Sequence, residues 1–278
     1  MSARRPVRKA VLITHGRPEQ VADGVVRLLA VARANGVELV VDAAEALKHG
    51  LDRHGDPAGA DVAVVLGGDG TMLRALQRHL GTGIPVLGVN FGRVGFLCAI
   101  GPDEMEVGLA RTFAGELEVV ELATLRVEVG GDAHVAVNDV VVTSGQLGRM
   151  VELEWAVGRE DLGRVPCDGL ICSTPSGSTA YNLSNGGPVL MWGIDAMAVT
   201  FVAPHSLHAR PLVVPRGGDV EVWNRTADVP VAVLVDGHRV DDADGGDRVC
   251  IGLGPERSLL GTLPEATFVH RYRKTFAT

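Results

Sequence analysis

The sequence predicts an α/β plus all-β protein, with a Rossmann-like amino-terminal α/β domain and a carboxyl-terminal β-sandwich-like domain. Over the first hundred residues, short β-branched runs alternate with helical patterns at the spacing of βαβ units. Beyond about residue 115 the chain changes to period-two alternation and β-rich runs separated by Gly, Asp and Pro turns. We therefore expect an α/β domain over 1–115, an all-β domain over 116–264, and a terminal segment, 265–278, that packs back on the first.

The α/β region opens with a strand at Val11–Ile13, a helix over Pro18–Asn35 and a strand at Leu39–Val41. Apolar residues recur along the helix at helical spacing, which predicts one buried face. The run Val62–Leu66 is apolar throughout, as is typical of a strand buried on both faces. The chain then turns into a helix that we expect to begin near Thr71.

The composition disfavours several classes of partner. The net charge is −8 and no basic stripe is interleaved with aromatic residues, so nucleic acid is not expected as a partner. No apolar run approaches the length of a membrane span. The four cysteines, Cys98, Cys167, Cys172 and Cys250, show neither Cys-x-x-Cys spacing nor clustering with histidines. They indicate reduced thiols in a cytoplasmic protein, rather than a zinc site or a disulfide framework.

The glycine-rich turn Gly67–Thr71, Gly-Gly-Asp-Gly-Thr, ends a predicted strand and opens a predicted helix. Such a turn brings backbone N–H groups and the positive end of a helix dipole to one place, which suits a phosphate. A carboxylate there, Asp69, is repelled by phosphate unless it binds a metal or accepts a proton from a nucleophile. Both roles belong to phosphoryl transfer. A plain tight turn is the alternative, but the carboxyl end of a parallel strand favours a ligand site.

Two further runs indicate a nucleoside site. Asp168–Asn182 joins a short apolar strand to a hydroxyl-rich turn beside one tyrosine, a surface able to bind the edge and face of a purine. A helix N-cap without a ligand is the alternative for this turn. Asn138 and Asp139 interrupt an otherwise apolar strand over Val135–Val142. They need buried partners, such as the hydroxyl groups of a ligand's ribose, or else they mark a bulge or turn.

Taken together, five runs resemble the NAD kinase family in order and spacing: Gly67–Thr71, Gly88–Leu97, Asn138–Asp139, Asp168–Tyr181 and Pro204–Leu207. Lipid kinases and phosphofructokinases share the first run, whereas the fourth is particular to NAD kinases. The resemblance implies phosphoryl transfer, dependent on Mg²⁺ or another divalent cation, from ATP or polyphosphate to the 2′-hydroxyl of the adenosine ribose of NAD. It also implies a homo-oligomer, a dimer or tetramer, with a site between the two domains.

The resemblance implies roles for individual residues. Asp69 matches the proton acceptor, Asn138 and Asp139 match the pair that holds the adenosine and its ribose, and Arg149 resembles a basic residue that reaches the diphosphate. Asp168 matches a carboxylate near the nicotinamide riboside. The expected donor-phosphate contacts are Gly67, Gly68, Thr71 and Arg74, and the remaining substrate contacts are Gly70, Phe96, Ser176, Thr179, Ala180, Tyr181, Asn182, Ser184 and His238.

Two departures from the family pattern stand out. The usual Asn-Glu pair appears as Asn138–Asp139, one methylene shorter, and Pro166–Cys167 precede Asp168 where the family often has an arginine. Two alternative functions remain. A lipid kinase of the diacylglycerol or sphingosine type would need an apolar acceptor groove, and a non-catalytic NAD(P)-binding regulator would have no use for Asp69.

Overall fold

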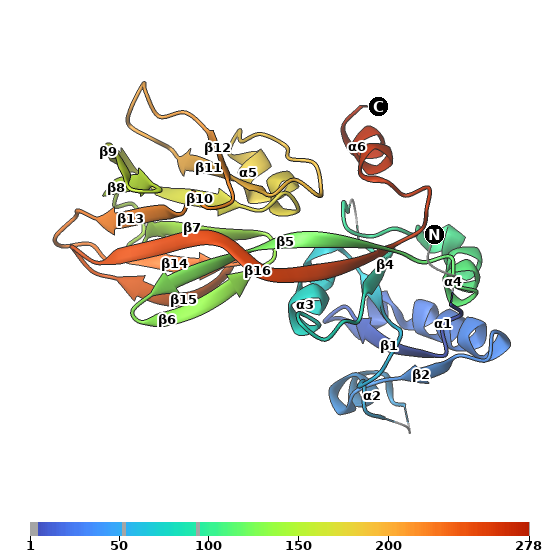
Figure 1. Cartoon of the computed structure of the whole chain (residues 1–278). Coiled ribbons are helices and arrows are strands. Elements are labelled where there is room, and N and C mark those ends of the chain that lie inside the picture. The colour runs from blue at the N-terminus through green and yellow to red at the C-terminus, as the bar shows by residue number, and fades with distance from the viewer. Residues whose placement is uncertain (1–4, 52–53, 93–94, 278) are drawn as a thin grey trace. The chain divides into compact units, whose positions relative to one another are not determined.

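The computed structural model describes residues 5–51, 54–92 and 95–277 (Figure 1). The chain divides into two compact units: unit 1 comprises Met1–Glu121 with Ser258–Thr278, and unit 2 comprises Leu122–Arg257. The first boundary thus falls later than the expected residue 115, and the chain returns to unit 1 before the expected residue 265. The reason is that both boundaries lie within long strands, β5 (Glu118–Val129) and β16 (Arg248–Thr262), rather than in linkers.

Unit 1 is built on a parallel sheet with the strand order β2-β1-β3-β4-β16, in which Leu260 of β16 lies opposite Val86. All residues of its central strand β3 are buried, which confirms the strand predicted from an uninterrupted apolar run. Leu12, Val64 and Leu87 of the sheet pack into one core with residues of the helices. The four amino-terminal strands are β1 (Lys9–Thr14), β2 (Glu38–Val40), β3 (Val62–Gly67) and β4 (Val86–Asn90).

The helices of unit 1 largely follow the predicted pattern. Val25, Leu28 and Ala32 form the buried face of the first long helix, as their spacing predicts. The third helix begins at Asp69, with Gly68 as an extended N-cap, two residues before the expected start near Thr71. The helical elements are η1 (Pro18–Gln20), α1 (Ala22–Ala34), α2 (Ala43–His49), α3 (Asp69–Arg78), η2 (Pro102–Glu104), α4 (Met105–Phe113) and α6 (Phe268–Phe276).

Unit 2 is dominated by antiparallel strands arranged in two layers. A six-stranded sheet has the order β12-β11-β10-β7-β14-β15, and the second layer contains β5, β6, β8, β9, β13 and β16. The strands not yet given are β6 (Asp132–Ala136), β7 (Asp139–Ser144), β8 (Val151–Val157), β9 (Glu160–Cys167), β10 (Gly169–Ser173), β11 (Ala196–Val202), β12 (Leu212–Pro215), β13 (Val220–Asn224), β14 (Val231–Val235) and β15 (His238–Ala243).

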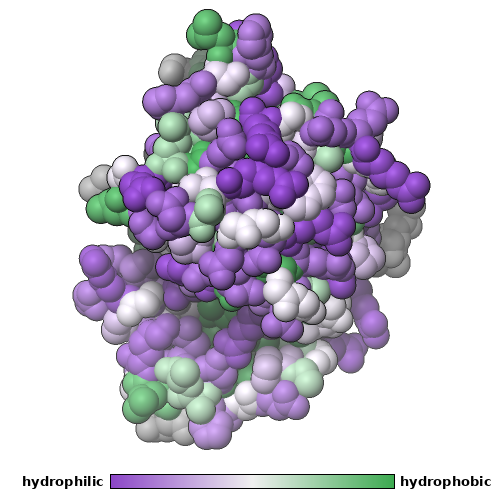
Figure 2. Space-filling model, turned by 90° about the vertical axis from the view of Figure 1, so that its left-hand side faces the viewer, coloured by the Kyte–Doolittle hydropathy of each residue, from purple (hydrophilic) through white to green (hydrophobic). Residues whose placement is uncertain are grey.

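The core of unit 2 lies between these two layers, as expected for a β-sandwich-like domain. Val142 and Leu170 of the six-stranded sheet belong to the same buried cluster as Leu153, Trp155 and Val222 of the second layer. Trp155 also meets Phe201 edge to face, with ring centroids 5.2 Å apart. The molecular face shown in Figure 2 is mostly hydrophilic, with its hydrophobic side chains in small separate groups.

The polar pair Asn138–Asp139 marks a crossing between the layers. The single strand predicted over Val135–Val142 is wrong, because β6 ends at Ala136 and β7 begins at Asp139. β6 pairs with β5, whereas β7 lies between β10 and β14. The polar residues therefore sit where the chain leaves one layer and enters the other, and their backbone groups need partners outside a sheet ladder.

Gly177, in the short helix η3 (Gly177–Thr179), allows this crossing to approach the next turn closely. A Cβ on Gly177 would lie 2.5 Å from the carbonyl carbon of Asn138 and 2.7 Å from its Cα. Because both contacts are with backbone, we expect Gly177→Ala to lower the free energy of unfolding by about 1–3 kcal/mol. Thermal or urea unfolding measures this loss.

The matched control is Gly16→Ala, because a Cβ at Gly16 would meet nothing within 4 Å. It should change stability by less than about 0.5 kcal/mol. Equal stability changes in the two variants would contradict the close approach.

Candidate active site

A pocket of about 320 Å³ in unit 1 lies at the carboxyl ends of β1, β3 and β4. Open α/β sheets bind ligands at this edge. All four residues expected to contact donor phosphates, Gly67, Gly68, Thr71 and Arg74, line this one pocket. Its other lining residues are His15, Gln20, Val21, Gly70, Phe91 and Gly92.

The pocket has the chemistry of an anion site. The first turn of α3 directs N–H groups and the positive end of the helix dipole toward it. Arg74, one turn further along, is exposed and adds a cation. The hydroxyl oxygen of Thr71 is buried and, within the described part of the chain, has no hydrogen-bond partner. A buried hydroxyl left unpaired is costly, so a ligand oxygen would stabilise it.

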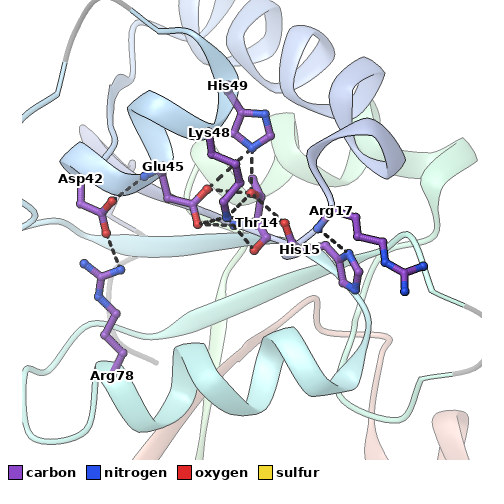
Figure 3. Close-up of polar contacts among 8 residues, drawn as sticks. All are labelled: Thr14, His15, Arg17, Asp42, Glu45, Lys48, His49 and Arg78. Carbon is purple, nitrogen blue, oxygen red and sulfur yellow. Dashed lines mark hydrogen bonds and ion pairs between the residues drawn. The ribbon is translucent and has the colours of Figure 1, made fainter.

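A buried polar cluster supports the wall of the pocket at the end of β1 (Figure 3). The carboxylate of Glu45, which is buried, accepts hydrogen bonds from the hydroxyl and the N–H of Thr14 at 2.6 and 3.1 Å. Lys48 Nζ lies 2.8 Å from the same carboxylate. His49 Nε2 lies 2.8 Å from the Thr14 hydroxyl, and burial holds the pKa of His49 below its usual value. These contacts fix the last residue of the strand.

The residue after Thr14 enters the pocket with a defined ring orientation. His15 Nδ1 accepts a hydrogen bond from the N–H of Arg17 at 3.1 Å, so the proton of the neutral ring is assigned to Nε2 (Figure 3). No motif in the sequence marks His15 or Gln20 as a site residue. The available signal was their position directly after the first strand of a parallel sheet, at the same edge as Gly67–Thr71.

The carboxylate of Asp69 is bound by backbone on both oxygens. Oδ2 accepts the N–H of Phe96 at 2.6 Å and Oδ1 accepts the N–H of Leu97 at 3.0 Å. A Cβ on Gly95 would lie 2.6 Å from Oδ1, so the glycine allows the chain to pass the carboxylate. Burial raises the pKa of Asp69, and the N–H donors oppose that rise. The result is a fixed, partly desolvated carboxylate whose proton affinity is raised, a change that favours a general base.

The run Gly88–Leu97 contributes these N–H groups, although its residues Arg93 and Val94 lie outside the described residues. The ring of Phe96, expected to line the adenosine pocket, is buried against Phe268 and Phe276 of α6. Arg271 of the same helix donates hydrogen bonds to the carbonyl groups of residues 96–98. From the sequence, this helix is expected only as a terminal segment, 265–278, that packs back on the first domain.

In unit 2, a second carboxylate organises the crossing at Asn138 and Asp139. Asp236 accepts the N–H groups of Val137, Asn138 and Asp139 at 2.8, 2.7 and 3.0 Å. Burial raises the pKa of Asp139 to about 7, and the charge of Asp236 adds to the rise. Asp236, which sequence analysis missed, therefore holds the backbone of the predicted substrate pair.

The hydroxyl-rich run meets this crossing directly. The hydroxyl of Thr174 donates to the carbonyl of Val137 at 2.7 Å, and the hydroxyl of Ser176 lies 3.3 Å from Asn138 Oδ1. The structure thus brings the runs Asn138–Asp139 and Asp168–Tyr181, which are remote in sequence, into one cluster. The run leads from β10 into η3 and α5 (Tyr181–Ser184).

The structure gives other expected contacts different surroundings. Asn182 is buried, and its amide donates to the carbonyls of Ser178 and Pro188, so it stabilises the turn. Arg149 is exposed and forms an ion pair with Asp228 at 2.9 Å. Thr179 and Ala180 are half-buried, and the exposed members of the predicted set, besides Arg74 and Arg149, are Gly70, Asp168, Tyr181, Ser184 and His238.

The site combines a parallel sheet, a glycine turn that forms an anion pocket, and a backbone-bound carboxylate in the first turn of the next helix. These features define a phosphotransferase of the two-domain kinase class. The sequence matches the ATP-NAD kinase N-terminal domain over residues 19–117 and the ATP-NAD kinase C-terminal domain over residues 137–260. The chain belongs to the NAD kinase family.

Relatives support the same assignment. The chain is 42% identical to an NAD kinase from Gemmatimonas aurantiaca over 77% of this chain and 76% of that protein. It is 37% identical to an NAD kinase from Symbiobacterium thermophilum over 93% of this chain and 95% of the relative. This membership decides against a lipid kinase.

Two solved structures are similar to the whole chain. An NAD kinase from Archaeoglobus fulgidus in complex with ATP has a TM-score of 0.73 at 26% identity, covering 97% of each chain. Yeast NADH kinase complexed with NADH has a TM-score of 0.86 at 21% identity, covering 98% of this chain and 88% of that one. The latter confirms the fold. Among the described residues, no helix combines the length and apolar character needed to cross a bilayer.

Asp139 makes the stability of the protein depend on pH. Its raised pKa means that the folded state keeps a proton that the unfolded chain loses near pH 4, so stability falls as pH rises from there to about 7. Asp139→Asn, which is neutral and nearly isosteric, removes this dependence. We expect it to raise Tm at pH 8 by about 2–4 °C, corresponding to about 1 kcal/mol, and by less at pH 5.

Calorimetry at the two pH values checks this difference. Asp132→Asn, at an exposed carboxylate of the same unit, is the control and should shift Tm equally at both values. A lower Tm of Asp139→Asn at pH 8 would show that the ionised carboxylate stabilises the fold, contrary to this account.

Proposed function

We propose that this protein phosphorylates NAD with ATP, transferring the γ-phosphoryl group to the 2′-hydroxyl of the adenosine ribose to give NADP. The observation that carries the proposal is the placement of Asp69: a desolvated, backbone-bound carboxylate at the start of α3, next to an anion pocket. Relatives named NAD kinase support the acceptor. The Archaeoglobus fulgidus structure, described as a complex with ATP, supports the donor.

In the proposed reaction, Asp69 accepts the proton of the 2′-hydroxyl as that oxygen attacks the γ-phosphorus and the bond to the ADP oxygen breaks. A pKa raised by burial improves a carboxylate as a proton acceptor near neutral pH. The N–H groups of Phe96 and Leu97 fix both carboxylate oxygens, so little reorientation is needed before proton transfer.

The donor phosphates would bind in the pocket of unit 1. The N–H groups of Gly68 and Gly70, the hydroxyl of Thr71 and the guanidinium of Arg74 are the proposed contacts, with His15 Nε2 as a further donor. The described residues contain no group of three or more His, Cys, Asp or Glu that could hold a metal. Mg²⁺ commonly binds through substrate phosphates, so we propose that a divalent cation enters with the donor and neutralises its charge.

The acceptor would bind through unit 2. We assign the adenosine and its ribose to Asn138 and Asp139, whose backbone Asp236 holds in place. Thr179, Ala180 and Tyr181 would contact the adenine and the nicotinamide side, and Ser176 would line the adenosine pocket. The remaining proposed contacts are Phe96, Arg149, Asp168, Ser184 and His238.

Two further properties complete the proposal. We assign the protein to the cytoplasm, in agreement with four cysteines that are free thiols. We also expect a homo-oligomer, a dimer or tetramer. Inorganic polyphosphate remains a second candidate donor because the pocket recognises phosphate, and a matrix of donors against NAD and NADH separates these substrates.

Replacing the proposed base tests the reaction. We expect Asp69→Asn to lower kcat by roughly 10²–10⁴, since the amide cannot accept the proton, while NAD binding stays within about threefold. Initial rates of NADP formation and calorimetric titration with NAD measure the two effects.

The matched control is Asp61→Asn. The Asp61 carboxylate also accepts two backbone N–H groups, those of Arg8 and Lys9, yet it precedes β3, at the opposite end of that strand from the turn Gly67–Thr71. It should retain kcat. Full activity of Asp69→Asn would exclude Asp69 as the base.

The pocket assignment is tested at Arg74, whose cation would contact donor phosphates. We expect Arg74→Gln to raise KM for ATP about tenfold, the loss of one charge-assisted contact, and to leave KM for NAD unchanged. Arg78→Gln removes the same charge further along α3, from an arginine paired with Asp42 outside the pocket. Steady-state kinetics should show no change in KM for ATP in this control, and equal effects of the two substitutions would refute the assignment.

A further inference from the structure

We propose that Arg271 of α6 is a positioning residue for Asp69, acting through the backbone segment Phe96–Cys98. This inference rests on the proposed function, because it concerns how the catalytic carboxylate is held. It adds a residue from the other end of the chain to the machinery of phosphoryl transfer.

The segment is held from both sides. On one side, the N–H groups of Phe96 and Leu97 donate to the two oxygens of Asp69. On the other side, Arg271 Nη1 lies 2.9, 2.8 and 2.9 Å from the carbonyl oxygens of Phe96, Leu97 and Cys98. Residues that orient the carboxylate are therefore oriented by the guanidinium, with only the peptide backbone between.

The guanidinium is itself anchored. Arg271 is 5% exposed, its Nε donates to the carbonyl of Ala266 at 3.0 Å, and its Nη2 donates to the hydroxyl of Thr262 at 2.8 Å. The planar fork of an arginine can serve these separate acceptors at once, which a lysine cannot. The Phe96 ring adds a second attachment, since it meets the Phe268 ring of α6 edge to face at 5.2 Å.

The charge of Arg271 acts on Asp69 as well. Burial lowers the pKa of Arg271 to about 10, which leaves the side chain charged at neutral pH. That charge opposes the burial that raises the pKa of Asp69. Burying a cation is costly. At this position the buried cation both serves the carbonyls of Phe96–Cys98 and lowers the pKa of Asp69.

A purely structural role makes a different prediction. If Arg271 only attached α6, its replacement would lower stability and activity together, and the pH dependence of the remaining activity would be unchanged. A positioning role predicts that kcat falls while both KM values hold, and that loss of the charge moves the pH profile.

The experiment compares Arg271→Leu, Arg271→Lys and the control Arg273→Leu, an exposed arginine on the same helix. Each full-length protein is assayed for NADP formation from NAD and ATP between pH 5 and 9, with Tm recorded. We expect Arg271→Leu to lower kcat about 10–100-fold. We also expect the ascending limb of its kcat–pH profile to move to higher pH by about one unit. Arg271→Lys keeps the charge, so its kcat should fall while the limb stays in place.

The control should match the wild type in kcat and in limb position. The proposal would be overturned if Arg271→Lys had both the kcat and the kcat–pH profile of the wild type. It would also be overturned if the ascending limb of the kcat–pH profile of Arg271→Leu did not shift. If Arg271→Leu does not fold, the loss of kcat at unchanged KM in Arg271→Lys carries the test. Absence of NADP formation by the wild-type protein would instead refute the proposed function, so the two failures are distinct.

Discussion

Two backbone hydrogen bonds to the carboxylate of Asp69 are the constraint on which the rest of the site depends. They exist because α3 begins at Asp69 and because Gly95 lets the next turn pass within contact of Oδ1. Burial then gives the carboxylate a raised pKa without freeing it to rotate. A general base needs both properties, a suitable proton affinity and one orientation.

Unit 2 also contains a carboxylate that accepts hydrogen bonds from backbone N–H groups, but there the carboxylate has a structural role. Asp236 also binds successive backbone N–H groups, and it fixes the crossing from β6 to β7. There the bound carboxylate supports the structure, and the nearby Asp139 is left with a pKa of about 7. In both units a carboxylate, half-buried at Asp69 and buried at Asp236, replaces the sheet ladder or helix as the partner of irregular backbone N–H groups.

Local patterns in the sequence predicted the parts of the protein that depend on local chemistry. The apolar run of β3 and the glycine turn after it predicted a buried strand and a pocket at its end, and the structure has both. The pattern around Asn138 predicts one interrupted strand and not a crossing, because the change of layer depends on pairing partners remote in sequence. Arg271 and Asp236 were missed for the same reason, since their partners lie about a hundred or more residues away.

Direct titration of the Asp69 carboxyl carbon by ¹³C NMR tests the central claim, with the signal assigned by its absence in Asp69→Asn. The account predicts a midpoint above the value of about 4 that is usual for aspartate, and a further rise in Arg271→Leu. A midpoint at or below 4 in the wild-type protein would contradict a desolvated base held by backbone N–H groups.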